Sequence, residues 1–206
     1  MSKLIDLSHP FQTGMPVYPG DIPVSLVQTR TMERDGYAHF TLSTNLHAGT
    51  HLDAPAHFIA GGNLVGDLPL DCFAGKGCLL DVRGEAMLGY KRVYDSLIKP
   101  GHIVLLWTNH SAAYGAEEYY AAHPVLSDGL TEFLIQKRVK MLGMDLPSPD
   151  GPPFRIHKRV LGANIPILEN LTNLGELEKF AQFEIMAFPV KISGEGCPVR
   201  VVARVD

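Results

Sequence analysis

The stretch from residue 38 to residue 58 constrains the fold more than any other part of the sequence. In residues 38–46, apolar side chains such as Phe40 and Leu42 alternate with polar ones, a period of two that is typical of a β-strand. The pattern runs directly into HAGTHLDAPAHF at residues 47–58. We therefore expect a rigid loop at the end of a strand, directing imidazole and carboxylate groups toward one place. These groups belong to His47, His51, Asp53 and His57.

Residues between the first two histidines dictate the shape of this loop. His47 and His51 are four apart, a spacing that would place both on one face of a helix. Gly49 between them and Pro55 just beyond disfavour a helix interior. A fully extended step of four residues would separate the Cα atoms by about 13–14 Å, too far for convenient sharing of one ion. The chain must therefore curl at Gly49, after which His51 and Asp53 can point the same way from an extended stretch.

The residue types in this motif indicate a metal site. Imidazole and carboxylate ligands together suit a divalent transition metal such as zinc, manganese or iron. Two alternatives are histidines without a ligand role and a closed structural metal site, although structural zinc sites prefer cysteine. A second, weaker cluster follows about a hundred residues later, at His157 and Glu169. On their own, these two residues could equally be solvated or locally paired.

Composition narrows the class of protein and its partners. The chain has 206 residues, 46% hydrophobic and 19% charged, with a net charge of −4, as in a compact protein with a substantial core. Without a basic stripe, nucleic acid and membranes are not expected partners. Neither a secretory signal nor an apolar run of about 18 residues is recognisable. The odd cysteine count, Cys72, Cys78 and Cys197, favours reduced thiols and a cytoplasmic location.

The order of expected elements indicates an α/β fold with a mixed sheet. No linker, low-complexity segment or repeat divides the chain, so we expect a single domain over residues 1–206. Helices are expected over residues 127–138, with Ser127 as N-cap, and over 154–161. Adjacent strands at both ends favour antiparallel pairing. The remaining expected strands cover residues 3–8, 23–30, 77–83, 102–108, 139–144, 165–168, 183–192 and 198–205.

The motif H-x-G-T-H-x-D-x-P-x-H-F, filled here from His47 to Phe58, resembles the signature of the putative cyclase family, which includes bacterial kynurenine formamidase and isatin hydrolase. The resemblance extends over essentially the whole chain. It implies a swivelling β/β/α fold, with a mixed sheet flanked by helices, usually assembled as a homodimer or larger homo-oligomer. Further matching segments are LIDLSHP (4–10), MPVYPGD (15–21), VKMLGMDLPSPD (139–150), IHKRVLGANIPILENLTNL (156–174) and FPVKISGEGCPVRVVA (188–203).

The resemblance also implies a role for each candidate residue. Two zinc ions are implied per chain, with manganese as the alternative known from the isatin hydrolase branch. His47, His51 and Asp53 correspond to the ligands of the first ion. The resemblance further implies that Asp53 bridges to a second ion, that His157 and Glu169 complete this second site, and that Glu169 contacts both ions. The position of His57 implies a proton donor and acceptor off the metals. Tyr18 corresponds to a tryptophan that lines the formamidase substrate pocket.

The expected activity is hydrolysis of an aryl formamide or related amide, a small-molecule substrate, by metal-activated water with His57 as proton shuttle. The sequence contains no G-x-S-x-G elbow, which argues against a serine hydrolase. The alternatives are opening of a cyclic amide or lactone, and a non-catalytic metal-binding relative. The sequence WTNHS at 107–111 departs from the formamidase pattern, as Tyr18 does, which leaves the substrate open. If Tyr18 only packs, the pocket is to be sought around residues 107–111.

Overall fold

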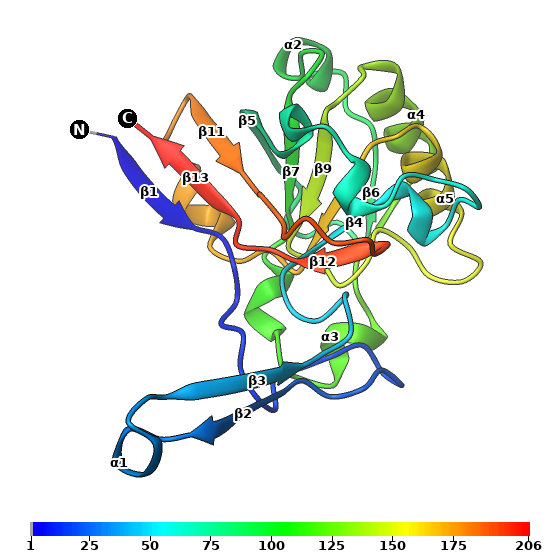
Figure 1. Ribbon diagram of the computed structural model, residues 1–206. Helices are drawn as coiled ribbons and strands as arrows, with labels where there is room; N and C mark the ends of the chain where they lie inside the picture. Colours follow the sequence, from blue (N-terminus) through cyan, green and yellow to red (C-terminus); the bar gives the residue numbers. More distant parts are fainter. Residues whose placement is uncertain (1) are drawn as a thin grey trace.

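The computed structural model describes residues 2–206, and a curled nine-stranded mixed sheet forms its centre (Figure 1). The four middle strands β5, β7, β9 and β10 run parallel, and the strands on either side pair antiparallel. The expected α/β class with a mixed sheet is therefore confirmed. In spatial order the strands are β1 (Lys3–Asp6), β13 (Val202–Val205), β11 (Phe183–Met186), β5 (Ala74–Asp81), β7 (Ile103–Trp107), β9 (Met141–Met144), β10 (Ile167–Glu169), β4 (His51–Asp53) and β12 (Gly196–Pro198).

Two apolar clusters cover the two faces of the sheet, and β7 contributes to both. Val104 and Leu106 of β7 belong to the cluster under α4 (Asp128–Gln136) and α5 (Arg155–Gly162), whereas Ile103, Leu105 and Trp107 belong to the other. All five β7 residues are buried, as its continuous apolar run predicts. Ser127 caps α4 as expected, because its side chain accepts from the Leu130 N–H at 3.1 Å.

The remaining elements are short and lie outside the nine-stranded sheet. The remaining helices are α1 (Met32–Asp35), α2 (Tyr94–Leu97) and α3 (Glu118–Ala121); the 3₁₀ turns are η1 (Pro55–His57), η2 (Val65–Asp67), η3 (Leu70–Phe73), η4 (His110–Ala113) and η5 (Leu174–Leu177). Strands β6 (Met87–Leu88) and β8 (Val125–Leu126) form a small parallel pair. The longest helix in residues 2–206 is α4 with nine residues, and none in that range is long and apolar enough to cross a bilayer.

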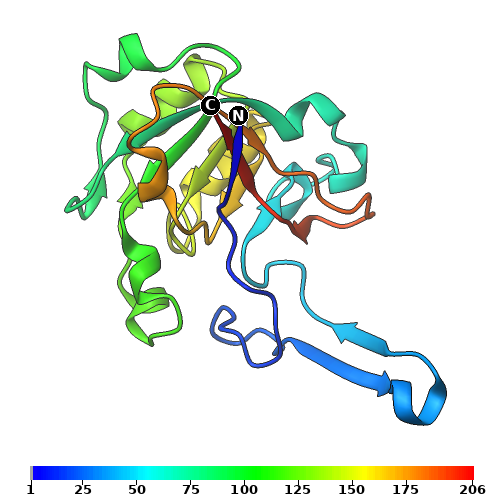
Figure 2. The ribbon, with the colours of Figure 1, turned by 90° about the vertical axis from the view of Figure 1, so that its left-hand side faces the viewer.

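Strands β2 (Ser25–Arg30) and β3 (His39–Ser43) form a two-stranded ribbon, called the arm below, which projects from the body with α1 at its tip (Figures 1 and 2). Every residue of β3 is exposed. The expected strand at 38–46 therefore exists, but it ends at Ser43 and does not join the central sheet. The alternating pattern is typical of a half-buried strand, but here its apolar side chains, Phe40 and Leu42, are exposed and no other part of residues 2–206 covers them.

The C-terminal strands are shorter than expected. The predicted strand 183–192 ends at Met186, and the predicted strand 198–205 divides into part of β12 and all of β13. Pro189 and Pro198 lack the N–H that continued pairing requires. The break at this point allows β12 to leave β13 and pair with β4 at the opposite edge of the sheet. As a result, residues 195–197 lie beside the histidine motif.

Candidate metal centre

Strand β4 carries the centre of the histidine motif, in a strand rather than the loop expected from the sequence. It pairs with β10 on one side and β12 on the other, and its three residues are buried. Leu52 joins the apolar core, so His51 and Asp53, on either side of it, share the opposite face as expected. The expected curl lies at Gly49, whose φ is +64° and where a Cβ would collide with the Met15 methyl group.

Three residues of this motif meet Glu169 around one point. The Asp53 Oδ1 atom lies 2.8 Å from His47 Nδ1 and 3.3 Å from His51 Nε2. Glu169 is paired directly with His51 in the antiparallel β10–β4 register, and its Oε2 lies 3.4 Å from His51 Nε2. The pairing of two strands that are far apart in sequence thus brings the second predicted cluster to the first.

His157 completes the arrangement from α5. Its Nε2 lies 3.1 Å from Glu169 Oε1 and 3.8 Å from Asp53 Oδ2. The five residues for which the resemblance implies metal binding therefore form one continuous cluster, in which Asp53 and Glu169 each face histidines from both sequence segments.

The unsatisfied atoms of this cluster show that it fits a divalent cation. His51 Nε2 and Asp53 Oδ2 are buried and have no hydrogen-bond partner within residues 2–206, whereas buried polar atoms are almost always paired. Ligand atoms of His51, Asp53 and Glu169 lie within 4.8 Å of one another, as do those of His47, Asp53 and His57. Nitrogen and carboxylate oxygen are ligands for zinc and manganese alike.

The pKa shifts of His51, His157 and Asp53 also indicate a site that favours a cation. Burial opposes protonation of His51, but Asp53 and Glu169 outweigh it and raise the pKa of His51 to about 10. Burial likewise opposes protonation of His157, whose pKa Asp150 and Glu169 raise to about 10. Burial favours a neutral Asp53, yet His51 and His47 bring the pKa of that carboxyl well below its usual range. The cluster thus attracts positive charge, which a divalent metal ion would supply in place of the protons.

Two hydrogen bonds fix the orientation of the two candidate ligand imidazoles, His51 and His157. His51 Nδ1–H donates to the Gly49 carbonyl at 2.8 Å, and His157 Nδ1–H donates to Asp150 Oδ1 at 2.6 Å. Both contacts leave an Nε2 lone pair facing the cluster, the usual arrangement around metal-binding histidines. The Asp150 Oδ2 atom also accepts from the Ile156 N–H at 2.6 Å, so one carboxylate positions both α5 and its histidine.

Three residues that support the cluster, Asp150, Asn170 and Glu195, were not predicted from the sequence. Asp150 was visible only as the end of a loop segment before the predicted helix, where an aspartate can cap the first turn. Asn170 donates from Nδ2 to the Gly49 carbonyl at 2.9 Å and accepts at Oδ1 from the buried Tyr119 hydroxyl at 2.8 Å. Glu195 Oε1 lies 3.3 Å from His47 Nε2. No local pattern signals the last two, since each contact depends on strand pairing.

His57 lies beside the cluster in η1 and differs from its neighbours. Its ring centroid is 4.2 Å from that of His47 and 6.2 Å from that of His157. Within residues 2–206 its ring nitrogens form no hydrogen bond. Burial lowers the pKa of His57, the opposite direction from His51 and His157. Both nitrogens are therefore free to meet a substrate, a water molecule or an ion.

A cavity of about 280 Å³ opens above the cluster. Tyr18 lines it with 42% of its surface exposed, and Phe58 and Phe154 add a tilted ring pair at 5.3 Å. Residues 107–111 are not among its lining; Trp107 instead packs under the Arg83 guanidinium at 3.7 Å. The full lining is Tyr18, Asp21, His47, His51, His57, Phe58, Tyr120, Pro147, Ser148, Phe154, His157, Glu169 and Asn170.

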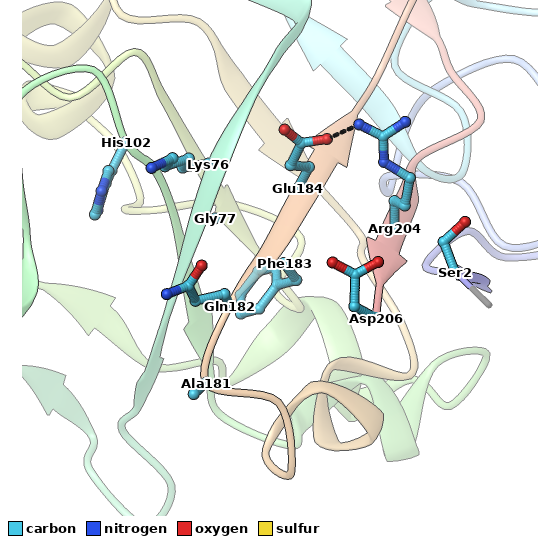
Figure 3. Close-up of a pocket in the computed structure, with 10 residues that line it drawn as sticks. All are labelled: Ser2, Lys76, Gly77, His102, Ala181, Gln182, Phe183, Glu184, Arg204 and Asp206. Carbon is cyan, nitrogen blue, oxygen red and sulfur yellow. Dashed lines mark hydrogen bonds and ion pairs between the residues drawn. The ribbon is translucent and has the colours of Figure 1, made fainter.

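A second cavity, of about 480 Å³, lies between β5, β11 and β13 (Figure 3). Its charged groups are mixed in sign, and Arg204 and Glu184 pair with each other across neighbouring strands. None of the candidate residues lines it. The chemistry indicated by the sequence therefore belongs to the cavity above β4.

Comparison with known proteins gives consistent matches. The profile of the family described as "Putative cyclase" matches residues 5–151. A kynurenine formamidase of Bacillus cereus is 30% identical over 210 residues, covering 98% of each chain. Isatin hydrolase A from Ralstonia solanacearum superimposes with a TM-score of 0.88 at 25% identity, covering 100% of this chain and 92% of that one. Isatin hydrolase A from Labrenzia aggregata, bound to benzyl benzoate, has the same fold with a TM-score of 0.88 at 24% identity, covering 99% and 94%.

Proposed function

This chain belongs to the putative cyclase family of metal-dependent hydrolases, and from that premise we propose that it cleaves an aryl formamide or a related amide, with His57 as the proton shuttle. One observation carries the proposal. His57 shares a cavity with a cluster that fits a divalent cation, yet its nitrogens form no hydrogen bond within residues 2–206. A metal-binding protein without catalysis has no use for such a group beside its ligands.

The metal-binding part of the proposal concerns five residues. His47, His51, Asp53, His157 and Glu169 would hold two zinc ions, with manganese as the alternative. A divalent ion held there would lower the pKa of a bound water molecule to about 7 and polarise a carbonyl oxygen. Asp150 and the Gly49 carbonyl keep the two buried imidazoles in the tautomer that this binding needs.

The proton-transfer part concerns His57. It accepts a proton from the attacking water as the new C–O bond forms at the formyl carbon. It then returns that proton to the leaving nitrogen as the C–N bond breaks, giving an arylamine and formic acid, which releases its own proton to solvent and becomes formate. Imidazole is suited to both steps because it titrates near neutral pH. Tyr18, with Phe58 and Phe154, would hold the aromatic ring beside it.

A second candidate activity is the opening of a cyclic amide or lactone. The 25% identical isatin hydrolase A from Ralstonia solanacearum, which covers the whole chain, favours it. Both activities use the same water and proton steps, so the metal cluster does not separate them.

One substrate panel tests the proposal. Protein reconstituted with zinc or manganese is assayed with N-formylkynurenine, N-formylanthranilate, isatin and simple lactones, and bound metal is counted by elemental analysis. We expect the formamides to be hydrolysed fastest, two ions per chain, and no activity after chelation until metal is restored. Full activity in metal-free protein contradicts the mechanism, and faster turnover of isatin or lactones favours the second candidate.

We also propose that the chain works as a single-domain homodimer in the cytoplasm. The arm supports the dimer, since an isolated two-stranded ribbon is only marginally stable in water and this one exposes Leu26, Phe40 and Leu42 on one face. A second copy of the chain would cover that face. The three cysteines form no disulfide, which supports a reducing compartment.

A further inference from the structure

The cavity has a wall that takes no part in the metal cluster. Tyr18 and Tyr120 meet there edge to face, with centroids 5.8 Å apart and an interplanar angle of 83°. Asp21 joins them through a tight turn, in which the Asp21 N–H donates to the Tyr18 carbonyl at 3.0 Å and Gly20 adopts a φ of +98°. The turn places the Asp21 carboxylate and the Tyr18 ring on the same rim, to which α3 adds the Tyr120 ring; these three residues are called the acidic rim below.

The charge of this rim is uncompensated. None of the described residues that line the cavity is a lysine or arginine. Apart from the candidate metal ligands and His57, Asp21 is the only one of the described residues lining the cavity that is an aspartate, glutamate, lysine, arginine or histidine. It forms no ion pair within residues 2–206, and it is exposed. Its charge also reaches Tyr120: burial chiefly, and then Tyr114 and Asp21, raise the pKa of that hydroxyl.

We infer that Asp21, with the rings of Tyr18 and Tyr120, selects substrates whose aromatic ring carries a positively charged ammonium side chain. The inference rests on the proposed function, because it assigns the substrate's amide to the metal end of the cavity and its side chain to the rim. A carboxylate attracts an ammonium group directly, and tyrosine faces attract it through their π electrons. A neutral side chain of the same size gains neither contribution.

The expected preference is moderate because Asp21 is exposed and salt screens it. An exposed ion pair and one cation–π contact together correspond to about three- to tenfold in affinity. The preference should appear in KM rather than kcat, because the ammonium group lies away from the reacting carbonyl and contributes equally to substrate and transition-state binding. It should also shrink at high ionic strength.

Two formanilides that differ only in a meta substituent test the inference on metal-loaded protein. One carries an aminomethyl group, cationic at neutral pH, and the other a neutral hydroxymethyl group. We expect kcat/KM to favour the cation about three- to tenfold in the wild type, and in Asp21→Asn this preference should shrink to the smaller part that the two tyrosine rings supply. Asp71→Asn, an equal charge change at an exposed residue outside the cavity, should keep the preference. Equal values in the wild type, or an unchanged preference in Asp21→Asn, overturn the inference.

A binding measurement separates this inference from the proposed function. Calorimetry compares benzylammonium with benzyl alcohol, on protein with and without metal, for wild type and both variants. If neither formanilide is hydrolysed, the proposed function fails, but tighter benzylammonium binding that weakens in Asp21→Asn and not in Asp71→Asn still supports the rim. If both are hydrolysed equally and both ligands bind equally, the function stands and the inference fails. Thermal unfolding of Asp21→Asn checks that the fold is intact.

Discussion

Strands β3 and β4 follow one another in sequence but have opposite environments. All five residues of β3 are exposed on the arm, whereas all three of β4 are buried between β10 and β12. Each contains a histidine, His39 and His51. The comparison shows that an alternating pattern predicts a strand, whereas the burial of that strand depends on what the rest of the chain places against it.

The difference in environment sets what each histidine does. His39 Nδ1 lies 2.8 Å from the Thr29 hydroxyl on the neighbouring strand, in contact with water. His51 Nε2 is buried between two carboxylates and has no hydrogen-bond partner among the described residues. A solvent-exposed imidazole can hydrogen-bond to water, so leaving it without a protein partner costs little free energy. A buried imidazole nitrogen without a partner is costly, and a cation bound between it and the two carboxylates would remove that cost. The following predictions test that contrast, the largest effect first.

Replacing the buried histidine should have the largest effect. In His51→Ala we expect loss of bound metal and a fall of hydrolysis to background, because Asp53 and Glu169 lose the nitrogen ligand between them. His39→Ala is the matched control on the arm, and should retain both metal and rate. Elemental analysis and a formamidase assay measure the two quantities. Full metal occupancy in His51→Ala would remove this residue from the ligand set.

His57→Ala should keep most of the metal and lose about 10²- to 10⁴-fold in rate, the usual contribution of a positioned general acid or base. The two variants thus separate a ligand from a proton shuttle inside one cavity. Because His57 lies within reach of an ion shared with His47 and Asp53, the outcome is informative either way. Metal loss equal to that of His51→Ala would show that His57 is a ligand.

Introducing a charge on the apolar face of the arm should weaken the proposed dimer and leave the content of bound metal unchanged. For Phe40→Glu we expect dimer dissociation to become easier by about 2 kcal/mol, roughly 30-fold in Kd, as for truncation of an aromatic interface anchor. Thr41→Glu, on the opposite face of the same strand, is the control. Sedimentation at a series of concentrations measures both. A monomeric wild type at every concentration would contradict the proposed dimer.

The smallest expected effect concerns His9, whose ring stacks on Tyr114 at 3.7 Å and whose Nε2 is buried without a partner in residues 2–206. Burial lowers the pKa of His9 to about 4, below the value of about 6.5 in an unfolded chain. The unfolded state therefore binds more protons between these values, so stability falls as pH decreases from 6.5 toward 4.

In His9→Gln this acid-side loss should be reduced. The difference in unfolding free energy between about pH 7.5 and about pH 5 should shrink by about 1 kcal/mol, allowing for solvent screening of a partly exposed ring. Urea unfolding of metal-free protein at both pH values measures it. His39→Ala again serves as the control from the arm. An unchanged pH dependence would show that His9 protonates without cost in the folded state.

Local features of the site followed from the sequence because they depend on neighbouring residues. The curl at Gly49, the shared direction of His51 and Asp53, and the Ser127 cap each involve residues within a few positions of one another. The search for a pocket at residues 107–111, if Tyr18 only packs, has no support from the cavity that holds the ligands. That segment instead reaches Asp145, where the Thr108 and Asn109 N–H groups donate to one buried carboxylate.

The sequence by itself determined the chemistry of the candidate ligands, the helix that carries His157 and the family to which the motif points, whereas the strand β4 that carries His51 and Asp53 was not predicted. The tertiary structure alone decided that the two ligand clusters meet, through the register that sets Glu169 opposite His51. It also decided that Asp150 orients His157, that Asn170 supports Gly49, and that Asp21 shares a rim with Tyr120. The physical reason is that these contacts join segments whose approach is set by strand pairing and core packing, which no short stretch of sequence encodes.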